Sequence, residues 1–213
     1  MSRWPCCSGT WPENTADYPL DIYFHDDDGI YVNLFTPSEV RWQFGRERVT
    51  VEQQTDFPKS DTMTFSMRLD RPARLALNVR VPEWASRPVK ISVNDRTIKI
   101  KSVPGSFLKI DRKWRDGDVL AVTIPMSLRF EPVDAQDPKL AALMYGPVML
   151  VALAGGPVNF HENESKPDQW IQLLDPDTLT FQAVDGTRFR PFNLITDERY
   201  TTYCDFSSSV AGR

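Results

Sequence analysis

Residues 62–69 read Thr-Met-Thr-Phe-Ser-Met-Arg-Leu, and residues 74–81 read Arg-Leu-Ala-Leu-Asn-Val-Arg-Val. In both stretches every second side chain is a large apolar one. Successive side chains of a β-strand point to opposite faces, so this alternation is typical of a strand that covers a core with one face. The two stretches therefore predict strands of a half-buried sheet.

Similar stretches occur at regular spacing around them. Residues 89–93 and 97–101 flank Asn94-Asp95-Arg96, a combination that predicts a hairpin. The other candidate strands of the first half are residues 30–35, 49–55, 107–110 and 119–124. Many short strands with one apolar face each predict an antiparallel β-sandwich over residues 25–133.

A second group of strand candidates begins near Asp134 and follows the same pattern. Because each run is short and apolar, we expect a second antiparallel, jelly-roll-like sandwich over residues 134–213. The last strand could instead return to the first sandwich. The candidate runs are residues 139–145, 148–153, 170–174, 179–184, 188–194 and 200–206.

The N-terminal residues 1–24 have a different, helical pattern. Thr10 and Glu13 match the capping box that starts a helix. Trp11 and Tyr18 lie on one helical stripe, and Pro19 limits the helix to about residue 18. We therefore expect one short helix before an all-β chain.

Charge narrows the classes of partner. The chain has 213 residues and a formal net charge of -4, without a long basic block. Nucleic acids and anionic membranes are therefore poor candidates as partners. No apolar stretch approaches the length of a membrane span.

The adjacent pair Cys6-Cys7 has two readings. The two cysteines could be reduced or disulfide-linked residues without a role. They could instead form a thiolate site, because a thiolate is both a strong nucleophile and a soft metal ligand. Cys204 stands alone in an apolar and aromatic run, which predicts a buried, inert thiol.

Three segments resemble one known family. They are Trp-Pro-Cys-Cys-Ser-Gly-Thr at residues 4–10, residues 22–38 with Tyr-Val-Asn-Leu-Phe at 31–35, and Leu-Ala-Ala-Leu-Met-Tyr-Gly-Pro-Val at 140–148. Together they are similar to the C-terminal part of glycoside hydrolase family 127, the β-L-arabinofuranosidase-like enzymes. The resemblance covers nearly all of the chain.

The resemblance implies a large retaining glycoside hydrolase with an N-terminal (α/α)6 barrel followed by β-sandwich domains. Its active site lies in the barrel, where three cysteines and a glutamate hold zinc and a separate glutamate is the acid/base. By position, Cys6 matches the zinc-bound nucleophile and Cys7 a neighbouring zinc ligand. An arabinofuranose-containing glycan is the implied substrate.

The chain begins shortly before the double cysteine, so the barrel and the other zinc ligands are expected upstream. Two thiols supply only half of the roughly four ligands of a closed zinc site. We therefore expect a C-terminal fragment that is inactive and zinc-free alone. The surface that would face the barrel, including Trp4, Trp11 and Tyr18, is expected to be exposed and to favour self-association.

A non-catalytic module that binds carbohydrate or forms a subunit contact is the competing hypothesis, because fold alone does not choose between these roles. Glu13 could line a sugar site, although the capping box already explains it. The segment His25-Asp26-Asp27-Asp28 suggests a solvated turn rather than a metal site. A solvated turn is also the expectation for residues 112–115, Arg-Lys-Trp-Arg.

Four tryptophans could form a platform for stacking on sugars. On β-sandwiches, however, aromatic side chains more often fill the core or the contacts between domains. The four residues are Trp42, Trp84, Trp114 and Trp170.

Overall fold

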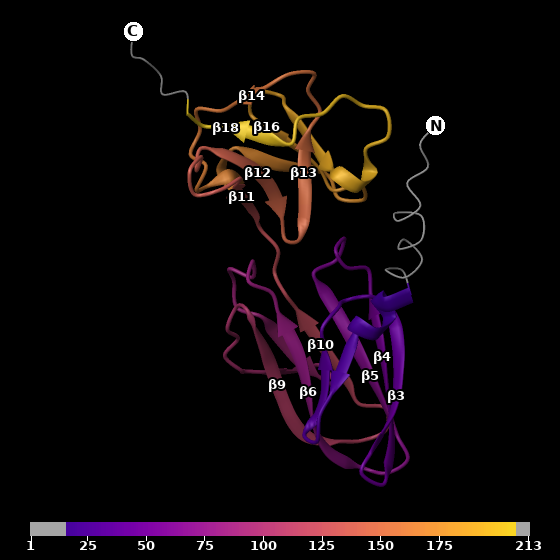
Figure 1. Cartoon of the computed structure of the whole chain (residues 1–213). Helices are drawn as coiled ribbons and strands as arrows, with labels where there is room; N and C mark the ends of the chain where they lie inside the picture. The colour runs from indigo at the N-terminus through magenta and orange to yellow at the C-terminus, as the bar shows by residue number, and fades with distance from the viewer. Residues whose placement is uncertain (1–15, 208–213) are drawn as a thin grey trace, which may run out of the picture. The chain divides into compact units, whose positions relative to one another are not determined.

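The computed structural model describes residues 16–207, which consist mainly of β-strands joined by turns (Figure 1). The all-β fold class expected from the sequence is confirmed. Among the described residues, Ala16 and Asp17 are α-helical and lead into the 3-10 turn η1 (Tyr18–Asp21). Two further short 3-10 turns are η2 (Pro167–Gln169) and η3 (Phe192–Leu194). Within this part, no helix has the length and apolar character needed to cross a membrane.

The chain divides into two compact units between Ile124 and Pro125. The sequence placed this division near Asp134. In the structure, β11 (Leu128–Pro132) pairs along its whole length with β12 (Leu140–Tyr145), so the intervening residues belong to the second unit.

The described part of the first unit contains two sheets, in which every pairing except β2 with β6 is antiparallel. One sheet has the order β1 (Tyr23–His25), β2 (Gly29–Val32), β6 (Ala73–Val81), β9 (Ser106–Trp114). The other has the order β3 (Ser38–Phe44), β4 (Glu47–Thr55), β5 (Thr62–Leu69), β10 (Val119–Thr123), β7 (Lys90–Val93), β8 (Arg96–Ile98).

The core of the first unit joins both sheets and makes it a sandwich. Met63 and Phe65 of β5 are fully buried, as the alternation in residues 62–69 predicts, and Leu75 and Leu77 of β6 meet them in the same apolar cluster. Trp114 at the end of β9 is also fully buried. The expectation of a solvated turn at residues 112–115 was therefore wrong for Trp114, because its ring completes this core.

Two turns set the geometry of the first unit. Asn94 and Asp95 have φ values of 48° and 62° and connect β7 to β8 as a two-residue hairpin, which confirms that prediction. Asp26 Oδ1 accepts hydrogen bonds from the N–H groups of Asp28 and Gly29, at 2.9 and 3.0 Å. This turn leads the chain into β2 beside β6.

The second unit is one branched sheet of eight strands. Strand β12 pairs with β11 along one edge, and its other edge is shared by β13 and β18. The last strand thus remains in the second unit. The path is β14 (Val158–Asn159), β18 (Tyr203–Asp205), β12, β13 (Val148–Ala152), β17 (Arg188–Pro191), β16 (Thr180–Ala183), β15 (Ile171–Asp175).

Aromatic side chains fill the core of the second unit. Trp170 stacks on Phe130 with ring centroids 5.7 Å apart, and Phe160 and Phe206 pack against the same pair. Phe189 from β17 is fully buried beside them. These aromatic contacts join residues of β11, β17 and the segments around β14, β15 and β18 in one apolar core.

Candidate functional site

The predicted nucleophile and zinc ligand Cys6, the predicted zinc ligand Cys7, and Glu13, which could line a sugar site, lie outside the described part of the chain. All three fall within residues 1–15. Within residues 16–207 there is no group of three or more His, Cys, Asp or Glu side chains that could hold a metal ion. The nucleophile and zinc-ligand assignments therefore stay predictions.

Cys204 is described, and it lies in the core of the second unit. The side chain is buried on β18, between β12 and β14. Burial, with a smaller contribution from the charge of Asp185, raises the pKa of the thiol to about 12. A thiol with so high a pKa is a poor nucleophile and a poor metal ligand at neutral pH, as expected for an inert core cysteine.

The segment around His25 forms a structural turn. Besides capping the turn, Asp26 accepts a hydrogen bond from the Tyr31 hydroxyl at 2.8 Å. Asp28 pairs with Lys109 at 3.1 Å. The carboxylates of Asp26 and Asp28 thus have different protein partners, and the segment forms a solvated turn, as the sequence suggested.

The four tryptophans do not form a common platform. Trp114 is buried and its Nε1–H donates to the Leu75 carbonyl oxygen at 3.1 Å. Trp170 is buried in the other unit and donates to the Asn163 carbonyl oxygen. Trp84 is partly buried and lines a surface cavity of the first unit.

This cavity, which we call the aromatic cavity, has a volume of about 390 Å³ and lies where β6 ends and β9 begins. The ring of Phe107 is 40% exposed and packs edge-on against Tyr31, with centroids 5.1 Å apart. Trp84 stacks on Phe57 at 6.4 Å. Two aromatic side chains are therefore held in place at one opening.

Polar groups line the same cavity. Arg80 and Glu83 contribute a guanidinium and a carboxylate, and Ser106 contributes a hydroxyl. The Nε of Arg80 is buried and has no hydrogen-bond partner among the described residues. A buried donor without a partner is unusual in a folded protein. An apolar surface with a few convergent polar groups is the usual form of a small-ligand site.

Sequence reasoning missed Phe107, although the strand pattern contained the signal. Leu108 and Ile110 are the buried residues of β9, so the alternation directs Phe107 to the opposite face. A large aromatic side chain on the outer face of a half-buried strand is an exposed apolar group.

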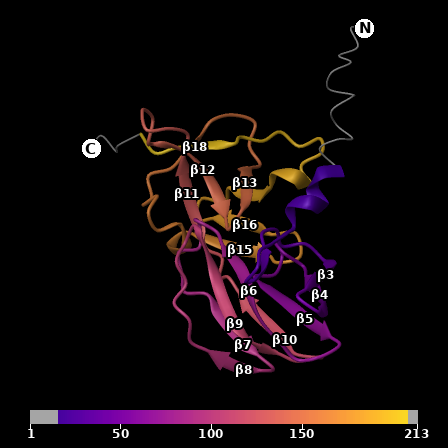
Figure 2. The same ribbon diagram turned by 60° about the horizontal axis from the view of Figure 1, so that its bottom comes forward.

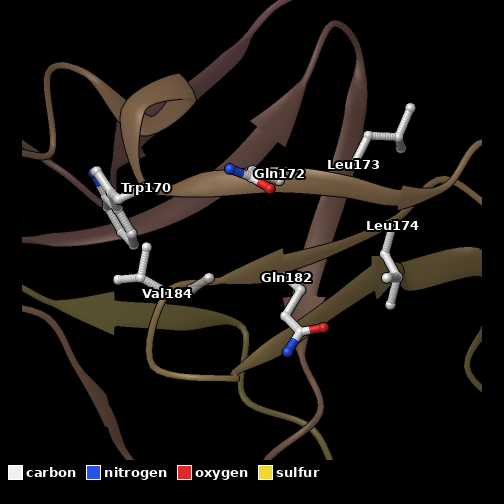
Figure 3. Close-up of a pocket in the computed structure, with 7 residues that line it drawn as sticks. Trp170, Gln172, Leu173, Leu174, Gln182 and Val184 are labelled. Atoms are coloured by element: carbon white, nitrogen blue, oxygen red, sulfur yellow. The ribbon is translucent and has the colours of Figure 1, made fainter.

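The second unit has a shallow groove on the hairpin of β15 and β16, with a volume of about 260 Å³ (Figure 3). Gln172 and Gln182 are paired in register on the two strands, and Trp170 and Val184 lie together at one end. Leu174 and Val184 are 53% and 67% exposed. The groove offers amides and apolar contacts, without a titratable group that could carry out hydrolysis.

These features define a β-sandwich domain followed by a second all-β unit, with surface cavities suited to binding. Residues 29–126 match the family model described as "Beta-L-arabinofuranosidase, GH127 middle domain". The match spans most of the first unit and confirms the resemblance to glycoside hydrolase family 127. Residues 29–126 of the chain are thus similar to a GH127 middle domain.

Solved structures share the fold over most of the chain. A GH127 β-L-arabinofuranosidase from Geobacillus stearothermophilus T6 superposes with a TM-score of 0.73 at 18% identity, covering 94% of this chain and 37% of that enzyme. A second GH127 β-arabinofuranosidase has a TM-score of 0.66 at 18% identity, with 86% and 36% covered. A third structure, a glycoside hydrolase, has a TM-score of 0.64 at 16% identity, with 86% and 37% covered.

The chain therefore spans little more than a third of the length of these enzymes. Comparison with curated protein sequences gave no match.

Proposed function

We propose that this chain is the β-domain part of a retaining glycoside hydrolase of the β-L-arabinofuranosidase type, and that it has no hydrolase activity alone. The observation that carries the proposal is the GH127 middle-domain match over residues 29–126. Enzymes of this fold are much longer than the chain, which leaves room for a separate catalytic domain.

In the complete enzyme we assign Cys6 as the nucleophile and Cys7 as a zinc ligand beside it, with Cys6 also bound to the metal. The donor set of this chain does not complete such a site. Two adjacent thiols leave about two positions unfilled. Cys204 does not fit as a third thiolate, because it is buried and its pKa is raised to about 12. The remaining ligands must come from a catalytic domain.

The first test measures hydrolysis of 4-nitrophenyl β-L-arabinofuranoside. The chain alone is expected to release no nitrophenol, and measurable release would refute its inactivity. Fused to a GH127 catalytic barrel, the chain is expected to support activity that Cys6→Ala abolishes. Cys204→Ala is the matched control and should leave activity unchanged. Full activity of the Cys6→Ala fusion would refute the nucleophile assignment, and a fusion that bound no zinc would refute the metal site.

The aromatic cavity supports a second role, contact with glycan. This proposal is supported by the exposed Phe107 and the partly buried Trp84, which both line the cavity, and by the Nε of Arg80, which has no hydrogen-bond partner among the described residues. Sugar rings present C–H faces to aromatic side chains and hydroxyl groups to guanidinium and carboxylate groups. A neutral arabinose-containing oligosaccharide has both kinds of surface.

Affinity electrophoresis in gels containing arabinan tests this role. The unmodified chain should be retarded, and Phe107→Ala should remove most of the retardation. Phe24→Ala is the matched control, since Phe24 is 48% exposed in the same unit and does not line the cavity. Equal mobility of the unmodified chain with and without arabinan would rule out the role.

Self-association is the remaining proposal for the surface expected to face a barrel. Tyr18 and Leu20 of η1 are 64% and 71% exposed, so apolar surface is available there. Light scattering over a range of protein concentrations should show a rising mass, which the double variant Tyr18→Ser/Leu20→Ser should suppress. A constant monomer mass would contradict this proposal.

A further inference from the structure

The first unit has another cavity, with a volume of about 640 Å³, which we call the basic cavity. The start of β8 contributes Arg96, the end of β9 contributes Arg112 and Lys113, and Arg115 follows directly after β9. Figure 2 shows β7, β8 and β9 at the same end of the unit. One carboxylate, that of Asp118, also lines the cavity.

Local structure fixes the backbone positions that carry these side chains. The two-residue turn at Asn94 and Asp95 starts β8 at Arg96. Trp114 is locked in the core by burial and by its hydrogen bond to Leu75. Because Trp114 is fixed, the residues on either side of it are held at the rim of the cavity.

The carboxylate of Asp118 already has partners within the protein. Its carboxylate accepts hydrogen bonds from Asn94 Nδ2 at 2.8 Å and from the Arg115 backbone N–H at 2.9 Å. It also lies 3.7 Å from the guanidinium of Arg112. Burial opposes ionisation, yet these hydrogen bonds and the positive charge of Arg112 hold the pKa of Asp118 below its usual value.

Charge is therefore unbalanced in the cavity. Arg112 is paired with Asp118 and lies over the Trp114 ring, 5.0 Å from its centroid. In the described part of the chain, Arg96, Lys113 and Arg115 form no ion pair. Elsewhere in the same unit, cations such as Arg68, Arg74 and Lys109 pair with carboxylates.

An excess of positive charge in a concave surface attracts anions, even on a chain with a net charge of -4. Guanidinium groups bind carboxylate and phosphate oxygens through paired N–H donors, and the ammonium group adds a point charge. The volume of the cavity lies within the range of small-molecule sites.

We propose that the basic cavity binds an oxyanion group of a small ligand, either the carboxylate of an acidic sugar or the phosphate of a sugar phosphate. Arg96, Lys113 and Arg115 supply the charge, and Asn94 borders the site. Only the sugar part of this ligand rests on the proposed glycosidase function. Binding of the oxyanion depends on this chain alone.

Isothermal titration calorimetry of the full chain tests the proposal with three probes. They are trigalacturonate, glucose 6-phosphate and a neutral arabinotriose. The test variant is Lys113→Ala/Arg115→Ala, whose side chains are exposed and outside the core. The matched control, Arg46→Ala/Lys59→Ala, removes the same charge from exposed positions of the unit that do not line the cavity. Far-ultraviolet circular dichroism verifies that both variants are folded.

The expected result is saturable binding of at least one anionic probe, weakened at least tenfold in the test variant and unchanged in the control. Binding should also weaken as NaCl is raised. Trigalacturonate binding identifies the carboxylate source, and binding of glucose 6-phosphate alone identifies the phosphate source. Absence of saturable binding for both anions, or equal weakening in the control, would overturn the proposal. Binding of the neutral arabinotriose tests the aromatic cavity instead, so the proposals for the two cavities can be refuted independently.

Discussion

Replacing Gly29 with alanine tests how the first unit is assembled. Gly29 begins β2, which runs parallel to β6 with Gly29 opposite Ala76. A Cβ atom at this position would lie 2.0 Å from the Ala76 carbonyl oxygen, whereas ordinary contacts begin at 3.4 Å. Because the obstacle is backbone rather than a flexible side chain, one strand must move by more than 1 Å.

That movement strains two hydrogen bonds between the strands. The Ala76 N–H donates to the Asp28 carbonyl oxygen at 2.9 Å, and Asn78 Nδ2 donates to the Ile30 carbonyl oxygen at 3.2 Å. Overpacking costs ~1–3 kcal/mol, and each weakened hydrogen bond adds ~1 kcal/mol. Gly29→Ala is therefore expected to lower the free energy of unfolding by ~3–5 kcal/mol.

Urea denaturation followed by tryptophan fluorescence measures the effect. The loss should move the midpoint of the first unit to lower urea by more than ~1 M. Gly45→Ala is the matched control: its φ is +60° and nothing lies within 4 Å of the added Cβ, so only a backbone cost of about 1–2 kcal/mol is expected. If Gly29→Ala is no less stable than Gly45→Ala, the close approach of β2 and β6 is wrong.

Three further predictions concern other parts of the chain. Trp114→Phe should lower the free energy of unfolding, measured by urea denaturation, by ~2–3 kcal/mol, because the substitution leaves a void and removes the hydrogen bond to Leu75. An unchanged urea midpoint would contradict the position of Trp114 in the core. In a chain with Cys6 and Cys7 replaced by serine, Cys204 should react with Ellman's reagent only after denaturation, and rapid native labelling would show that it is accessible. Hydrogen bonds from the Thr196 backbone and side chain, together with the charge of nearby Arg190, lower the pKa of Glu198 to about 2. The ionised Glu198 carboxylate therefore stabilises the folded state fully above the ordinary pKa of 4.5, and this stabilisation is lost as the pH falls toward 2. The stability difference between Glu198→Gln and the unmodified chain should therefore be present at pH 7 and vanish near pH 2, and a difference independent of pH would refute it.

The alternation of apolar and polar residues along single strands was enough to predict most strands of the first unit and the faces that they bury. Met63 and Phe65 are buried as the period of two requires, and the hairpin at Asn94 and Asp95 follows from local turn chemistry. The same alternation also predicts that Phe107 points outward, because Leu108 and Ile110 on the same strand point into the core. The core position of Trp114 agrees with the general expectation for aromatic side chains, whereas its charged neighbours favoured the wrong prediction of a solvated turn at residues 112–115.

Local sequence thus determined which segments become strands and which of their faces are apolar, because backbone geometry and side-chain direction are properties of a few neighbouring residues. Only the tertiary structure decided which strands pair. In the tertiary structure β2 runs parallel to β6, and the close approach of the two strands requires glycine at position 29. One edge of β12 pairs with both β13 and β18. The tertiary structure also placed Arg96 of β8 and Arg115, which follows β9 of the other sheet, at one cavity, since contacts between residues distant in the chain depend on the packing of the whole core.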